Sequence, residues 1–166
     1  MAPVGGLGVG RRSEDESPAD QLSDVAPVFE PVKLVRVLTN EVGFPGESPD
    51  GSRNVYTVVF QLSEEPSARW GDFFVHFWDR PQVAYAQSHH RPGMASVVAN
   101  RLVLEETTID EVEGYHLPVI KAAVRMANEA EGRAVVEDHR RAERRRLEEA
   151  EHRRHVAEVA KRLPLE

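Results

Sequence analysis

The alternation of apolar and polar positions is clearest over residues 54–62, NVYTVVFQL. Successive side chains of an extended strand point to opposite sides, so alternate residues share a face. Here that face carries Tyr56, Val58, Phe60 and Leu62. Residues 32–39 (VKLVRVLT) are also rich in β-branched and apolar side chains. The pattern predicts two strands, joined by a long turn-rich connector over 40–53, in a sheet with one well-buried side.

Residues 66–79 (PSARWGDFFVHFWD) change to a helical period. Five aromatic side chains fall on one stripe at spacings of three and four: Trp70, Phe73, Phe74, Phe77 and Trp78. Pro66 stands where a helix begins and Pro81 where it would stop. A strand is the alternative, favoured by Gly71 and by the aromatic composition. We expect the helix.

The pattern then predicts a strand pair over 82–87 and 94–104, with a turn at 89–93. Thr108 and Glu111 have the spacing of a capping box, which predicts a short helical turn that ends near Gly114. A second helix begins at 116–118. Its apolar stripe is Leu117, Ile120, Val124 and Ala127, widened by Val119, Ala123 and Met126.

The order β-β-α-β-β-α predicts an α+β fold. It is a two-layer sandwich with a mainly antiparallel, four- to five-stranded sheet covered by helix, followed by a long charged C-terminal helix. If 66–79 were a strand, the domain would be a meander of about five strands capped by one long helix.

Residues 137–166 hold nine basic and eight acidic side chains, and every residue up to Leu163 is compatible with helix. Glu precedes Arg by four residues at Glu137–Arg141, Glu149–Arg153 and Glu158–Arg162, a spacing that stabilises helices. The apolar positions keep no clean heptad, so a long coiled coil is not predicted. The last turns carry a short stripe that can dock on a partner or on a second copy: Val156, Val159, Ala160 and Leu163. The sequence leaves open whether Gly132 breaks this helix from the one before it.

Composition divides the chain of 166 residues into three parts. All 11 aromatic residues lie between Phe29 and Tyr115. Residues 1–27 are dominated by Gly, Pro, Ser and acidic side chains, which predicts a disordered acidic N-terminal arm. We therefore expect an α+β core domain over 28–136 and a charged helix over 137–166.

Other composition features exclude classes of protein. The chain has no cysteine, so it forms no disulfide and no Cys-ligated zinc site. No apolar run is long enough for a membrane span, and the first residues lack the pattern of a secretory signal. We expect a cytoplasmic protein with no membrane partner. The use of 18 Arg against 3 Lys indicates a GC-rich genome, and we expect a bacterial source.

Candidate chemistry is sparse. Adjacent His89 and His90 in a predicted turn can combine with His116 as metal ligands, which would make a metal-dependent enzyme. The core nevertheless holds no HExxH, HxH or HxxxH pattern, and the serines lack a nucleophile elbow. Enzymatic activity is open but not favoured, and we expect no cofactor.

A basic cluster raises nucleic-acid binding as an alternative. It is formed by Arg140, Arg141, Arg144 and Arg145, which can share one helical side. Acidic residues interleave with the bases, no aromatic is available there for stacking, and the net charge of the chain is −7. A salt-bridged, solvated helix is the preferred interpretation of the cluster.

The sequence thus favours a non-catalytic protein-binding or self-assembly module. Its predicted contact residues are the aromatic stripe Trp70, Phe73, Phe74, Phe77 and Trp78, together with Val156, Val159 and Leu163 of the C-terminal helix. The partner is another protein or a second copy. A nucleic-acid-associated accessory protein comes second, and a metal-dependent enzyme built on His89, His90 and His116 comes third.

Overall fold

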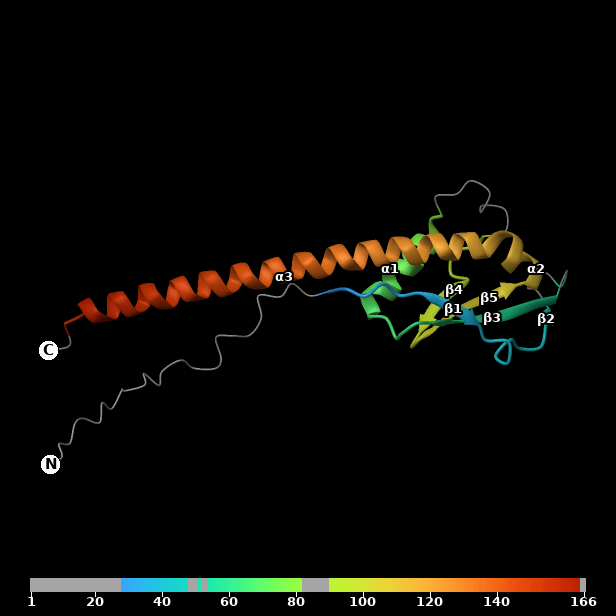
Figure 1. Cartoon of the computed structure of the whole chain (residues 1–166), viewed down its shortest axis with the longest axis horizontal. Helices are drawn as coiled ribbons and strands as arrows, with labels where there is room; N and C mark the ends of the chain where they lie inside the picture. Colours follow the sequence, from blue (N-terminus) through green and yellow to red (C-terminus); the bar gives the residue numbers. More distant parts are fainter. Residues whose placement is uncertain (1–27, 48–50, 52–53, 82–89, 165–166) are drawn as a thin grey trace, which may run out of the picture.

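A computed structural model describes residues 28–47, 51, 54–81 and 90–164. It has an α+β fold in which an antiparallel sheet of about five strands lies beneath helices (Figure 1). The strands are β1 (Leu34–Val37), β2 (Gly46–Glu47), β3 (Asn54–Leu62), β4 (Ala95–Val98) and β5 (Arg101–Thr107). The helices are α1 (Ala68–Asp79), α2 (Ile109–Glu111), the π-helical turn η2 (Val112–His116) and α3 (Leu117–Arg162). The predicted fold class is confirmed.

Strand β3 lies at the centre of the sheet. The strand order is β1-β3-β5-β4, and β2 pairs with the beginning of β3. Val58, Phe60 and Leu62 point into the core, as the alternation predicted. On the opposite face Val59 is also buried. Two contacts attach residues 38–41, which follow β1, to the sheet. Leu38 N donates to the carbonyl of Val59, and Arg101 Nε lies 2.8 Å from Glu41 Oε2.

The aromatic segment is helical, which confirms the preferred prediction. The helix begins after Ser67, whose hydroxyl accepts a hydrogen bond from Trp70 N at 3.0 Å, so this side chain satisfies one of the free amides of the first turn. Trp70, Phe74 and Trp78 are fully buried between the sheet and α3. The rings of Trp70 and Phe74 stack with centroids 5.8 Å apart.

The prediction of one strand over 94–104 was wrong, because the segment is a hairpin. Strand β4 ends at Val98 and β5 begins at Arg101, and these two residues are paired across a turn made by Ala99 and Asn100. Ala99 has φ of +52°, a left-handed conformation that an L side chain rarely adopts. Sequence rules look for Gly, Asn or Asp at such a position, which explains the miss. The predicted strand at 82–87 and the predicted N-terminal arm at 1–27 lie outside the described residues.

Helix α3 joins the two helical segments that the sequence predicted into one element. The capping box is present: Thr108 Oγ1 accepts from Glu111 N, and Glu111 Oε2 accepts from Thr108 N. The helical turn does not end near Gly114, as predicted, but continues through η2 into α3. The helix also runs through Gly132 unbroken. A Cβ at that position would lie 3.4 Å from Phe29 Cδ1, so this glycine allows close approach of an aromatic ring.

The turn at Ala99 gives a first prediction. Ala99→Gly should stabilise the protein by roughly 0.5–1 kcal/mol, because glycine adopts a positive φ without steric cost. Urea denaturation would measure the change. Ala95→Gly is the control: Ala95 is buried in β4, and there the same loss of a methyl group should destabilise. A destabilised Ala99→Gly protein would contradict the role assigned to this turn.

Candidate interaction surface on helix α3

The predicted aromatic contact surface needs correction. Trp70, Phe74 and Trp78 have no exposed surface, and Phe73 and Phe77 are half-buried against the same core. The sheet and α3 together cover the stripe, which a single helix viewed alone cannot reveal. The three buried rings therefore build the core and are closed to a partner in this fold.

The predicted histidine cluster is brought together only in part. His90 and His116 both lie against the ring of Trp78, with centroid distances of 4.4 and 5.7 Å. Burial lowers the pKa of His90 below its ordinary value, although the charge of Asp79 opposes this. His89 lies outside the described residues. Among the described residues no three His, Asp or Glu side chains are grouped closely enough to hold a metal ion.

Two open clefts flank the start of α1. One, of about 350 Å³, lies beside the segment 28–32 and is lined by Glu64, Glu65 and Glu131. The other, of about 430 Å³, lies between α1 and β4, where Gly71 and Ser96 contribute to the lining. With Glu30, four carboxylates make the first cleft acidic, and the second is lined mainly by small side chains.

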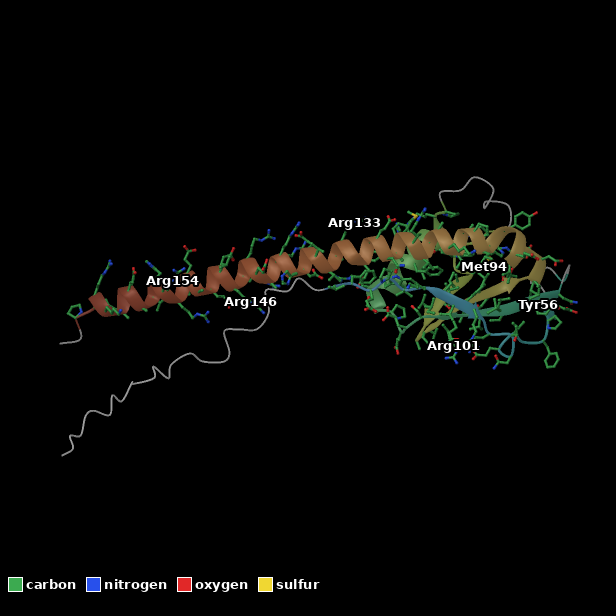
Figure 2. All side chains as sticks on the ribbon, in the orientation of Figure 1. Tyr56, Met94, Arg101, Arg133, Arg146 and Arg154 are labelled. Carbon is green, nitrogen blue, oxygen red and sulfur yellow. The ribbon has the colours of Figure 1, made fainter. Side chains whose placement is uncertain are left out.

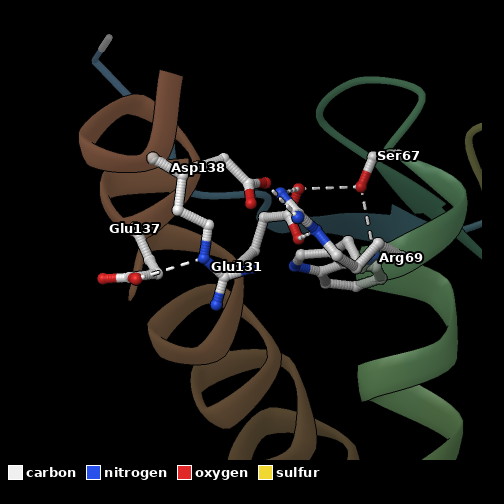
Figure 3. A network of polar contacts seen from close by, with 7 residues as sticks. Ser67, Arg69, Glu131, Glu137 and Asp138 are labelled. Carbon is white, nitrogen blue, oxygen red and sulfur yellow. Dashed lines mark hydrogen bonds and ion pairs between the residues drawn. The ribbon is translucent and has the colours of Figure 1, made fainter. Parts of the chain in front are cut away.

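A polar network joins α1 to α3 (Figure 3). Arg69 of α1 reaches two carboxylates of α3, with Nε 2.8 Å from Glu131 Oε2 and Nη1 2.6 Å from Asp138 Oδ2. The hydroxyl of Ser67 donates to Glu131 Oε1 at 2.9 Å. The carboxylate of Glu131 is almost wholly buried, with 6% of its side chain exposed, so these donors take the place of water around it.

Asn128 extends the network to the first described segment. Its side-chain oxygen accepts from Val32 N at 3.0 Å and from Trp70 Nε1 at 2.8 Å, and its amide donates to the carbonyl of Val32. One side chain thus connects the first described segment, α1 and α3. Sequence reasoning missed this junction because its partners are 58–96 residues apart in the chain. One feature of the sequence could have revealed the junction: Asn128 and Glu131 continue the spacing of the apolar stripe of α3, so two polar side chains lie on its buried face.

Asp138 is the last residue of α3 that bonds to another element. Beyond it we call residues 139–162 the distal helix. Within the described chain no hydrogen bond or ion pair joins a side chain of the distal helix to any other helix or strand; its contacts with Glu137 stay within α3. At about 1.5 Å per residue it extends for roughly 36 Å. Figure 1 shows it projecting well past the sheet and α1.

The distal helix is exposed around its circumference, as Figure 2 illustrates for Arg146 and Arg154. Large apolar side chains are among the exposed ones: Leu147 (70%), Val156 (50%), Val159 (40%) and, at the C-cap, Leu163 (59%). The predicted contact residues Val156, Val159 and Leu163 are therefore accessible. Their role as contacts stays a prediction.

The basic cluster is partly neutralised. Glu137 Oε1 lies 3.2 Å from Arg141 Nε and 3.8 Å from Arg144 Nη2. Arg141, Arg144 and Arg145 line a shallow surface together with Asp138 and Glu148. Arg140 is not part of that lining. Carboxylates inside the patch weaken its attraction for phosphate groups.

No helix of the described residues combines the length and the apolar composition that a membrane span needs. Comparison of the chain with protein-family models, with curated proteins and with solved structures gave no match.

The buried end of the Arg69 ion pair gives a second prediction. Arg69→Met should lower the unfolding free energy, because the buried carboxylate of Glu131 loses its cationic partner. Replacing both residues (Arg69→Met with Glu131→Leu) should recover part of the loss. Arg101→Met is the matched control, since it breaks an exposed pair with Glu41 and should cost clearly less than Arg69→Met. Equal losses in urea denaturation for the two single variants would contradict this reading of the junction.

A third prediction concerns acid. The hydrogen bond from Arg69 lowers the pKa of Asp138. Because the folded value lies below the unfolded one of about 3.9, this contact stabilises the fold above that pH and is lost as pH falls through the folded value. Carboxyl NMR titration should show a depressed pKa for Asp138 that rises towards the ordinary value in Arg69→Met. An unchanged titration curve in the variant would show that the ion pair does not form in solution.

Proposed function

We propose that the chain is a non-catalytic protein-binding module and that the distal helix is its contact element. The observation that carries the proposal is a projecting helix of roughly two dozen residues whose side chains, within the described chain, make no hydrogen bond or ion pair to any other helix or strand. Most helices in proteins derive their stability from tertiary packing, and a short isolated helix in water is marginal. A partner would supply the missing packing.

The exposed apolar side chains support the proposal. Val156, Val159 and Leu163 lie within two turns of each other, whereas single exposed apolar residues would need no explanation. Charged neighbours would form the polar rim of such a contact. Helix binding by an apolar stripe spaced at three and four residues is a common mode of recognition.

The fold also supports the proposal because it holds the distal helix in a fixed direction relative to the domain. Helix α3 is continuous from the core into the distal helix, and the Arg69 network holds α3 at the last point before it leaves the domain. A contact element on a rigid support loses less conformational freedom on binding than one on a flexible tether.

Site-specific photo-crosslinking in the source cell tests the proposal. A photoreactive amino acid at Val156 should give a discrete protein adduct. The same probe at Leu147 is the matched control, because Leu147 is also exposed but lies nine residues away, about 2.5 helical turns, and therefore on the opposite face. Absence of any protein adduct at Val156, or equal labelling at both positions, would overturn the proposed function.

A further inference from the structure

The face of α3 that packs against the domain continues into the distal helix. Asn128, Glu131, Val135 and Asp138 follow each other at spacings of three or four residues and contact or line the region around α1 and the first described segment. The same spacing continues along the helix with Ala142, Arg146, Glu149, Arg153, Val156, Ala160 and Leu163. We call these seven residues the seam.

Together with the residues directly beside it, the seam accounts for most of the apolar side chains of the distal helix. Four of its members are apolar, and Ala150, Ala157 and Val159 lie beside it by helical spacing. Leu147 is the large exception on the opposite side. The seam also carries Arg146, Glu149 and Arg153. From residue 146 to residue 162, all of which are described, no side chain has a hydrogen bond or ion pair, so these charges are available to a partner.

We infer that the occupant of the seam is a second copy of this chain, with the two distal helices antiparallel and centred on residue 151. This inference rests on the proposed function and names its partner. In that register Glu149 of each copy faces Arg153 of the other. Ala142 faces Ala160, and Val156 faces the aliphatic stem of Arg146. Each dimer would thus contain two Glu–Arg contacts and two Ala–Ala contacts along the seam.

Charge decides the orientation. A parallel pair would place Glu149 against Glu149, Arg153 against Arg153 and Arg146 against Arg146, three like-charge contacts along the seam. The antiparallel pair replaces them with opposite charges or an apolar neighbour. Beside the seam it places Ala150 against Ala150 and Arg145 against Val159, so no two formal charges of equal sign meet there.

The position of the folded domain restricts the register of the two distal helices. Shifting the partner by one heptad towards the core would keep a Glu–Arg contact, between Arg146 and Glu149. It would also bring the partner's Leu163 opposite Gly132, where Phe29 packs and where Arg69 holds Glu131 and Asp138. The opposite shift removes both Glu–Arg contacts. With residue 151 at the centre, Leu163 meets His139, one residue beyond the last bond to the domain.

Sedimentation of the full chain, with charge exchange, tests the pairing. The unaltered protein should form a dimer. Glu149→Arg alone and Arg153→Glu alone should each raise the dimer dissociation constant about tenfold or more, because each puts like charges face to face twice. The exchange of both residues in one chain should restore dimerisation. Glu158→Arg, which lies off the seam, should leave the dissociation constant unchanged, and circular dichroism checks that every variant keeps its helix.

Crosslinking between engineered cysteines tests the orientation of the two helices. Because the chain has no cysteine of its own, the crosslinker reacts only at the introduced positions. A short bismaleimide should link Ala142→Cys chains to Ala160→Cys chains in a mixture, and should not link Ala142→Cys chains to each other. Homotypic linking at position 142 would overturn the antiparallel pairing. So would a monomer at every accessible concentration, or a dimer indifferent to both charge reversals.

The two proposals fail in different ways. A photo-adduct of Val156 at twice the 18.6 kDa of the chain supports the self-pairing. An adduct of another mass on a chain that sediments as a monomer overturns the self-pairing and leaves the protein-binding function in place. Absence of every adduct overturns both.

Discussion

The structure depends on the burial of three aromatic rings, Trp70, Phe74 and Trp78, between the sheet and the first turns of α3. Large aromatic side chains bury more apolar area than any other residues, and these three supply much of a small core. Because α1 carries them on one stripe, α1 must lie flat between the two layers. Helix α3 must then cover α1, and this fixes the direction in which the remainder of α3 leaves the domain.

The polar junction converts that packing into a defined geometry. Apolar contacts alone are non-directional, and α3 could slide or rotate on a surface of Trp and Phe rings. Asn128 restricts both movements because its amide must meet Val32 and the indole nitrogen of Trp70 at once. Arg69 adds a second fixed point further along the helix, at Glu131 and Asp138. Two such points specify the axis of α3, and so the axis of the distal helix.

Local patterns predicted the elements whose cause is local. The alternation in 54–62, the aromatic period in 66–79 and the Thr108–Glu111 capping box each determine their structure through neighbours within a few residues, and each prediction was confirmed. The hairpin at Ala99 was missed because the pairing of β4 with β5 places a left-handed residue at a position where the sequence has neither Gly, Asn nor Asp. The extent to which the aromatic stripe is covered was not predictable locally, because part of the cover is α3, some fifty residues away. The close approach of Phe29 to Gly132 likewise joins residues more than a hundred positions apart in the chain.

Contacts between distant segments also explain why the surroundings of one face of α3 change at Asp138. Up to that residue the domain supplies the partners of the charged side chains, and Glu131 can be buried because Arg69 and Ser67 come from the same chain. Beyond it the face keeps its spacing but meets only solvent within the described chain, and it carries Ala and Val beside single charges. A face meant only for water would gain nothing from grouping its apolar residues on the side that already faces the domain. Grouping of this kind stabilises a helix only when something covers it, and the cover must begin where the domain ends.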